Sequence, residues 1–207
     1  MSFDIVSDIH LDKDNVWIPG DNRGDGLILA GDIFEIESQM EIGIKYLTYL
    51  STLYECIIYI PGNHEFYNTN GTPIELLQDM LKEMCEEIPN IHILIDDIFE
   101  YKSYIFVGTT YYTHIYSSGK ISPNNDFRFI YSDYDKLLTF DSMNDLHKQS
   151  KQKLLTNLEN IKKCQDTIVV VVTHFNPGIV GSKIHVDDEQ WIAYDSHDIF
   201  NSGLVDK

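Results

Sequence analysis

Hydrophobic residues along this chain alternate between short continuous runs and longer stretches with helical spacing. Four apolar runs have the length and composition of buried strands: Phe3 to Val6, Leu27 to Ala30, Ile57 to Ile60 and Ile168 to Val172. Further strands are predicted at Ile91 to Ile95, Tyr104 to Val107 and Ile98 to Lys102, the last as part of a hairpin. Strands of this kind, separated by helical patterns, are typical of an α/β fold.

Three helices are predicted between the strands. The first, over Glu37 to Leu53, places Met40, Ile44, Leu47 and Leu50 at helical spacing. The second begins at Pro73, a residue favoured in the first turn of a helix, and the third extends from about Ser142 to Ile161.

The segment from Tyr111 to Asp135 has no clear period and is predicted to be a long irregular loop. Two interpretations stay open for it. It is either a surface excursion whose tyrosines pack down, or a substrate-binding loop. In the second case some of the residues Tyr111, Tyr112, His114 and Arg128 face the substrate.

Length and composition favour one soluble globular domain over residues 1–207. Hydrophobic residues make up 43% and charged residues 23%, which excludes disordered, collagen-like and coiled-coil proteins. The apolar runs are too short for a membrane helix, and the first residues do not resemble a signal peptide. The three scattered cysteines fit a reduced compartment, so we expect a cytoplasmic protein.

The charge is strongly acidic. Lys and Arg number 15 against 33 Asp and Glu, which gives a net charge of −18. Such a protein repels a phosphate backbone, so we expect no long nucleic acid as a partner. The short apolar runs predict no membrane partner either. If the protein handles a phosphate group, bound metal cations are expected to supply the positive charge.

Polar residues with metal-binding side chains follow four of the predicted strands. They are Asp8 and His10, Asp32, Asn63 with His64 and Glu65, and His174. The carboxyl ends of strands are where open α/β sheets gather their sites. Mixed oxygen and nitrogen ligands suit manganese, iron or zinc better than calcium.

The spacing also has local reasons. Asp8 and His10 lie two positions apart, so in an extended backbone they point the same way. Gly31 and Gly62 each precede a candidate ligand, where the chain must turn and lie close to its neighbours. No zincin motif, nucleophile elbow or phosphate-binding loop of the Walker type is present.

The four blocks Asp8-Ile9-His10, Gly31-Asp32, Gly62-Asn63-His64-Glu65 and Thr173-His174 resemble those of the calcineurin-like metallophosphoesterases, in particular the small bacterial and phage-type enzymes. The resemblance implies a β-sandwich of two mixed sheets flanked by helices, with a two-metal site at one edge. It implies Asp8 and His10 on one ion, a bridging Asp32, and Asn63 and His174 on the other ion. It further implies His64 as a general acid and Glu35 as the residue that orients His64.

This resemblance predicts a metal-dependent hydrolase of a small phosphodiester or phosphomonoester that uses a metal-activated water. The alternative is a degenerate member of the same fold that binds a ligand or a partner without catalysis. Metal content, combined with hydrolysis of generic chromogenic esters, separates the two.

The family pattern closes with Gly-His-x-His, which this sequence lacks. Only His185 and His197 follow His174. The expected explanation is a chain shortened at its C-terminus, either as a piece of a longer protein or as a naturally shortened gene. The other is a real loss with His185 or His197 as a substitute. In each case the resemblance implies weakened metal binding and reduced activity.

Overall fold

The computed structural model describes residues 1–11, 16–115, 124–161, 166–177 and 194–195. Their elements, in chain order, are β1 (Phe3–Val6), β2 (Gly26–Ala30), α1 (Ile36–Ser51), β3 (Cys56–Ile60), η1 (His64–Phe66), α2 (Ile74–Glu86), β4 (Ile91–Ile93), β5 (Asp97–Tyr101), β6 (Tyr104–Thr109), β7 (His114–Ile115), α3 (Asp126–Phe129), β8 (Tyr131–Asp133), β9 (Lys136–Leu137), α4 (Phe140–Asn160), β10 (Ile168–Thr173) and β11 (Tyr194–Asp195).

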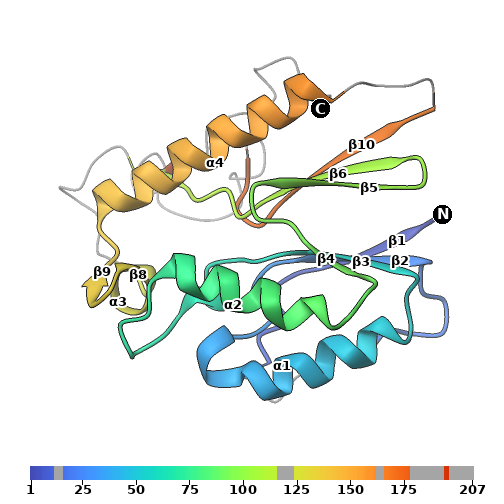
Figure 1. Cartoon of the computed structure of the whole chain (residues 1–207), viewed down its shortest axis with the longest axis horizontal. Helices are drawn as coiled ribbons and strands as arrows, with labels where there is room; N and C mark the ends of the chain where they lie inside the picture. Colours follow the sequence, from blue (N-terminus) through green and yellow to red (C-terminus); the bar gives the residue numbers. More distant parts are fainter. Residues whose placement is uncertain (12–15, 116–123, 162–165, 178–193, 196–207) are drawn as a thin grey trace, which may run out of the picture.

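Two sheets lie between helices, so the chain forms four layers (Figure 1). The first sheet has the strand order β1-β2-β3-β4, and all of its strands are parallel. Helices α1 and α2 cover its outer face, and the sheet β10-β6-β5 lies on its inner face (Figure 1). In this second sheet β10 is parallel to β6, whereas β5 is antiparallel to β6. The α/β class is confirmed, but the expectation of two mixed sheets is wrong for the first sheet, whose described strands are parallel throughout.

Alternate residues of each strand point to opposite faces, and this divides the interior into separate cores. Leu27, Leu29, Ile57 and Tyr59 pack against α1 and α2, whereas their neighbours Ile28 and Ile58 pack against Phe106 and Val172 of the second sheet. A third cluster joins Val107 of β6 to Leu154 and Leu158 of α4. The apolar runs that form β2 and β3 are therefore strands buried on both faces.

The three predicted helices are present with shifted ends. Pro73 is the N-cap of α2 in an extended conformation, so the helix begins one residue later than predicted. The third helix begins earlier, because Thr139 and Ser142 form a capping box at its start. In α1 the inward face includes Gly43, where a Cβ atom would lie 2.5 Å from the Phe34 ring, while Ile44 is 37% exposed.

The segment predicted as an irregular loop contains short elements. Strand β7, helix α3 and strand β8 all lie within residues 111–135, of which residues 116–123 fall outside the described part. Tertiary hydrogen bonds hold these elements in place. The Asn68 amide donates to the Phe129 carbonyl at 2.9 Å, and the Leu138 amide donates to the Ile130 carbonyl at 2.8 Å. The prediction of a loop without secondary structure is wrong here, because these elements depend on distant partners.

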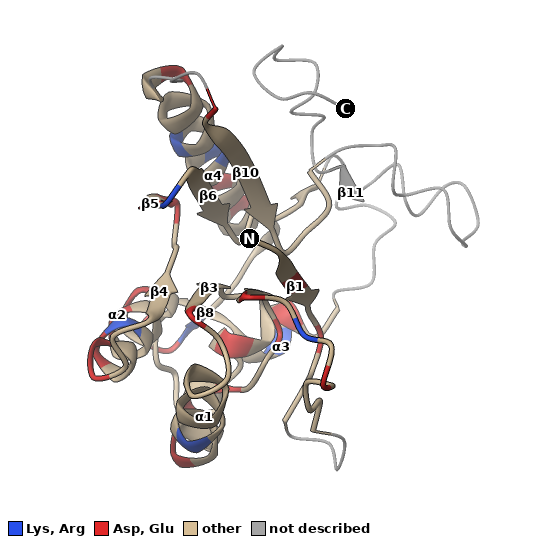
Figure 2. Ribbon diagram, turned by 90° about the vertical axis from the view of Figure 1, so that its right-hand side faces the viewer, with Lys and Arg blue, Asp and Glu red and all other residues tan. Residues whose placement is uncertain are grey.

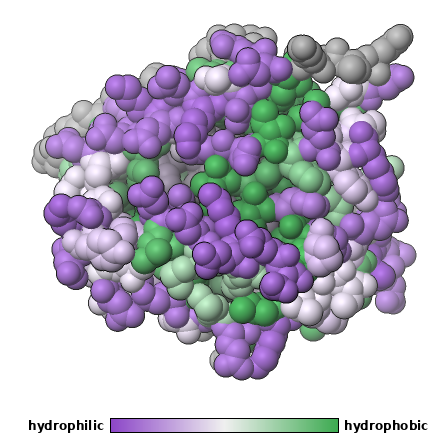
Figure 3. All heavy atoms as spheres, viewed as in Figure 1, coloured by the Kyte–Doolittle hydropathy of each residue, from purple (hydrophilic) through white to green (hydrophobic). Residues whose placement is uncertain are grey.

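The acidic residues are distributed over the outer helices, with lysines and arginines lying singly among them (Figure 2). Four lysines each pair with an acidic residue: Lys45, Lys102, Lys136 and Lys153. The face seen in Figure 3 is mostly hydrophilic over the helices, with hydrophobic atoms between α4 and α2. Among the described helices, none combines the length and the hydropathy needed to cross a bilayer. The exclusion of nucleic-acid and membrane partners stays a prediction.

Candidate functional site

The loops that follow β1 and β2 run side by side at the carboxyl edge of the first sheet. The amides of Asp8 and His10 donate to the carbonyls of Gly31 and Asp32, both at 3.0 Å. Asp8, His10 and Asp32 all have positive φ angles, of 55°, 47° and 59°. Non-glycine residues adopt this left-handed region at an energetic cost, and such strain tends to collect at functional sites. The backbone thus adopts an energetically unfavourable conformation at three of the predicted metal ligands.

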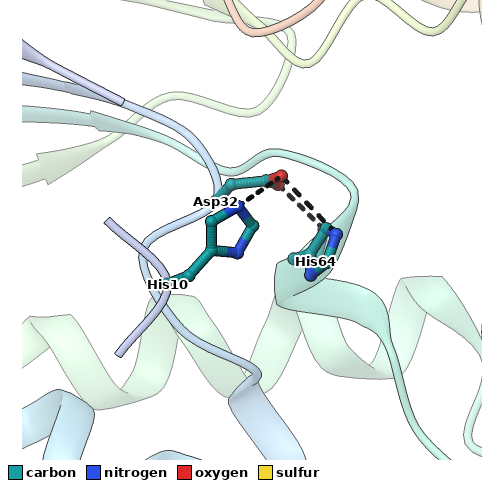
Figure 4. Close-up of side chains that lie close together, drawn as sticks. All are labelled: His10, Asp32 and His64. Atoms are coloured by element: carbon teal, nitrogen blue, oxygen red, sulfur yellow. Dashed lines mark hydrogen bonds and ion pairs between the residues drawn. The ribbon is translucent and has the colours of Figure 1, made fainter. Parts of the chain in front are cut away.

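The Asp32 carboxylate lies between the side chains of His10 and His64. Its Oδ2 atom is 3.8 Å from Nε2 of His10 and 3.9 Å from Nε2 of His64 (Figure 4). These three side chains form a group that could hold a metal ion. The His10 and His64 rings also meet edge to face, with their centroids 4.4 Å apart.

The second sheet contributes His174, which follows β10. Its Nδ1 atom is 2.8 Å from the Ala30 carbonyl oxygen, and its Nε2 atom is 3.1 Å from Oδ1 of Asn63 and 3.4 Å from Oδ1 of Asp32. The two oxygens of Asp32 therefore face different histidines. The arrangement brings together the carboxyl ends of strands from both sheets, as the sequence pattern predicts.

Glycines make this close approach possible. At Gly31, which has a φ of 90°, a Cβ atom would lie 2.4 Å from the His174 ring. At Gly62 a Cβ atom would lie 2.2 Å from Oδ1 of Asp32. Any larger residue at either position would displace a side chain of the site.

Glu65 belongs to one of the predicted blocks, but the sequence analysis did not assign it the structural role that it has here. It is fully buried in η1, and Oε2 accepts hydrogen bonds from the amides of Asp32 at 2.9 Å and Gly62 at 2.8 Å. Oε1 accepts from the Ile33 amide and the Tyr59 hydroxyl, each at 2.7 Å. One carboxylate thus fixes the loop that carries Asp32 against the loop that carries Asn63 and His64. Its place directly after these two residues was the available signal.

The electrostatics of the site favour a cation. Burial raises the pKa of Asp32, with nearby His174 opposing the shift. Burial also raises the pKa of Glu65, and the neighbouring Asp32 carboxylate adds to this effect. Two carboxyl groups buried close together are costly when ionised, and a divalent cation would relieve that cost.

Behind Asn63 lies a buried acid that the sequence analysis also did not single out. Asp126 of α3 is 2% exposed, and its Oδ1 atom accepts hydrogen bonds from Nδ2 of Asn63 at 2.8 Å and from the Tyr67 hydroxyl at 2.6 Å. Nothing in the local sequence marks it, because Asn63 and Tyr67 lie about 60 residues earlier.

The other predicted catalytic and metal residues have different surroundings. The Asp8 side chain is 60% exposed, and its Oδ1 atom is 3.9 Å from Nε2 of His10. The Glu35 carboxylate accepts a hydrogen bond from the Ser38 hydroxyl at 2.6 Å, at the start of α1. Its orienting role toward His64 stays a prediction. His185 and His197 lie outside the described residues.

The predicted substrate-binding residues do not share one environment. Tyr112 is 2% exposed, and its ring centroid lies 5.7 Å from that of Phe175, the residue after His174. His114 lies in β7, with its ring 5.5 Å from that of His147, and Arg128 is exposed on α3. Tyr112 is therefore buried next to the residue that follows His174, whereas Arg128 is exposed to solvent.

Comparison with known proteins finds a solved structure with a similar fold and a viral protein with a similar sequence. The fold is similar to that of the phosphopantetheinyl hydrolase from Mycobacterium tuberculosis, with a TM-score of 0.70, 17% identity, and coverage of 98% of this chain and 78% of that chain. An uncharacterised protein of Acanthamoeba polyphaga mimivirus is 34% identical over 141 residues, which cover 64% of this chain and 49% of that protein. The chain thus spans about half the length of this curated relative.

A scan against protein-family models finds no match for this chain. The expected membership in the calcineurin-like metallophosphoesterase superfamily is therefore corrected: no family model supports it, and the similar solved structure carries the name of a phosphopantetheinyl hydrolase. The physical reason lies in the motifs. Short blocks of metal-binding residues at strand ends report the chemistry of a site, and they do not by themselves specify a family.

Proposed function

We propose that this chain hydrolyses a small phosphomonoester or phosphodiester with the help of two divalent metal ions. The observation that carries the proposal is the position of Asp32. One of its oxygens faces the His174 ring, which also contacts Asn63, and the other faces the His10 and His64 rings. A carboxylate placed in this way is suited to bridge two cations. The likeness to a solved structure named a hydrolase supports the same reaction class.

The donor set fits manganese, iron or zinc. Asp8 and His10 would hold one ion, Asn63 and His174 the other, and Asp32 would serve both. These side chains offer carboxylate, amide and imidazole donors, which borderline metals accept. Bound divalent ions would offset charge on the phosphoryl oxygens and lower the pKa of a water ligand.

His64 is proposed to act as the general acid. Its ring stacks on Tyr67, with the centroids 4.1 Å apart and the planes at 28°, and its backbone amide donates to Oδ1 of Asp32 at 2.9 Å. These contacts fix the imidazole beside the proposed metal ligands without burying it fully. Protonated, it would donate a proton to the departing oxygen of the ester.

The experiment that tests the proposal is hydrolysis of p-nitrophenyl phosphate and bis-p-nitrophenyl phosphate by protein treated with EDTA and then supplied with Mn²⁺. We expect Mn²⁺-dependent turnover that Asp32→Asn abolishes. A His64→Asn variant should lose roughly 10²–10⁴-fold in turnover and keep its metal. Metal binding without turnover of either ester would contradict hydrolysis and favour a binding protein. Loss of metal from His64→Asn would show that His64 is a ligand.

A further inference from the structure

A buried carboxylate outside the proposed ligand set controls how Asn63 presents its side chain. Asp126 reaches the back of the site from α3, and Oδ1 of this carboxylate accepts from both Asn63 and Tyr67. Its other oxygen accepts from the Asn124 side-chain amide at 3.1 Å. Asp126 is therefore a buried residue, and both oxygens of its carboxylate accept hydrogen bonds.

The hydrogen-bond inventory of this cluster permits one arrangement. An ionised carboxylate only accepts, so the single proton of the Tyr67 hydroxyl is donated to Asp126. The Tyr67 oxygen is then an acceptor, and Nδ2 of Asn63 lies 3.2 Å from it. Nδ2 of Asn63 thus donates toward both the Asp126 carboxylate and the Tyr67 oxygen.

The consequence is the direction of the Asn63 oxygen. Because Nδ2 of Asn63 donates toward Asp126, Oδ1 points away from that carboxylate. It lies 3.1 Å from Nε2 of His174. Turning the amide over would place its oxygen where Nδ2 now lies, 2.8 Å from a carboxylate oxygen, and two acceptors would meet in a buried site. The negative charge of Asp126 therefore selects the metal-facing orientation of Asn63.

Tyr67 extends the same effect to His64. The Tyr67 hydroxyl accepts and donates within this cluster, and the His64 imidazole stacks on the ring of the same residue. The hydroxyl of Tyr67 is fixed by Asp126, so the stacking surface is fixed as well.

We propose that Asp126, acting through Asn63 and Tyr67, is a positioning residue that keeps the Asn63 oxygen and the His64 ring directed into the site. Its orienting effect is independent of metal. Only its consequence for metal affinity rests on the function proposed above. Loss of a residue that hydrogen-bonds to a metal ligand typically lowers metal affinity by about 10–100-fold.

The metal-independent test uses the side-chain amide signals of Asn63 in EDTA-treated protein, observed by NMR. In the wild type we expect these signals to be shifted by the two hydrogen bonds and slow in exchange with solvent. Asp126→Asn replaces the carboxylate by an amide that can present either atom, so exchange should become faster. Tyr67→Phe removes one partner and keeps the stacking ring, so a smaller change is expected. Signals that do not respond to Asp126→Asn would overturn the inference.

The second test is a double-mutant cycle on Mn²⁺ affinity, measured by calorimetry. Asp126→Asn should weaken binding about 10–100-fold. In an Asn63→Ala background the same change should have little further effect, about twofold or less, because the two residues act in series. Additive losses would overturn the inference.

Glu37→Gln provides the matched control. Glu37 also accepts hydrogen bonds from an amide and a hydroxyl, those of Asn70 and Thr72, and none of these three residues is a proposed ligand or the proposed general acid. Glu37→Gln should leave Mn²⁺ affinity unchanged. A wild type that binds no Mn²⁺, with amide signals that still respond to Asp126→Asn, would refute the proposed function and support the positioning role.

Discussion

Replacing Glu65 by glutamine should destabilise the metal-free protein by about 2–4 kcal/mol, although the two side chains have the same shape. The carboxylate accepts four hydrogen bonds with its two oxygens, from three backbone amides and the Tyr59 hydroxyl. Glutamine offers one oxygen, so one pair of donors would meet a side-chain NH₂ group. The substitution changes hydrogen bonding and charge, and almost nothing else.

The magnitude follows from which oxygen is replaced. If NH₂ replaced Oε2, it would face the amides of Asp32 and Gly62, which cannot turn away. At Oε1 the Tyr59 hydroxyl can rotate to accept, which leaves only the Ile33 amide without a partner. An unpaired buried donor costs about 1–3 kcal/mol, and each remaining bond loses about 1 kcal/mol because its acceptor is no longer charged.

Part of this loss is recovered. Burial raises the pKa of Glu65, which means that ionising the side chain in the interior is itself unfavourable, and neutral glutamine does not bear this penalty. The net expectation is thus about 2–4 kcal/mol rather than the full sum.

Equilibrium unfolding in urea, with EDTA present, measures the effect as a lower midpoint at unchanged slope. Tyr59→Phe removes only one of the four donors and leaves no backbone group unpaired, so it should be less destabilising. A Glu65→Gln protein within about 0.5 kcal/mol of the wild type would show that the four hydrogen bonds do not hold these loops together.

Three further outcomes are expected. Gly62→Ala should lower both stability and Mn²⁺ affinity, because a Cβ atom would lie 2.2 Å from a carboxylate oxygen of the site; unchanged affinity would refute the close approach. Burial lowers the pKa of His92 below its ordinary 6.5, so its contribution to stability is full above that value and is lost as the pH falls through the folded pKa; His92→Gln should flatten this part of the pH profile. In a Cys164→Ser variant, Ellman's reagent should not react until the protein unfolds, because Cys56 and Cys85 are buried with pKa values raised to about 11 and about 12; rapid reaction of the native protein would contradict this.

The sequence predicts the strands well because each is a local signal. The runs that form β2 and β3 are buried on both faces, so they are apolar at every position. Parallel strands deliver their carboxyl ends to one edge of a sheet, and here the carboxyl ends of β2 and β10 meet although the two strands belong to different sheets. Asp32 and His174 are brought together in this way from opposite ends of the chain.

Features that depend on distant partners are not predictable in this way. Asp126 is an ordinary acidic residue in the sequence, and its importance comes from Asn63, which lies 63 positions away. Glu65 likewise acts through contacts with another segment, because it accepts from the amides of Asp32 and Ile33, more than 30 positions earlier. The family assignment goes beyond what the motifs support, because ligand types at strand ends describe a site's chemistry and not its ancestry.

The most direct test of the proposed metal site is anomalous diffraction at the manganese edge from crystals of the protein grown with Mn²⁺. The account predicts anomalous peaks on both sides of the Asp32 carboxylate, one toward His10 and the other toward His174. A peak on one side only would contradict the bridging role of Asp32. Crystals grown with Mn²⁺ that show no anomalous peak near Asp32 would contradict the proposal of a metal-dependent hydrolase.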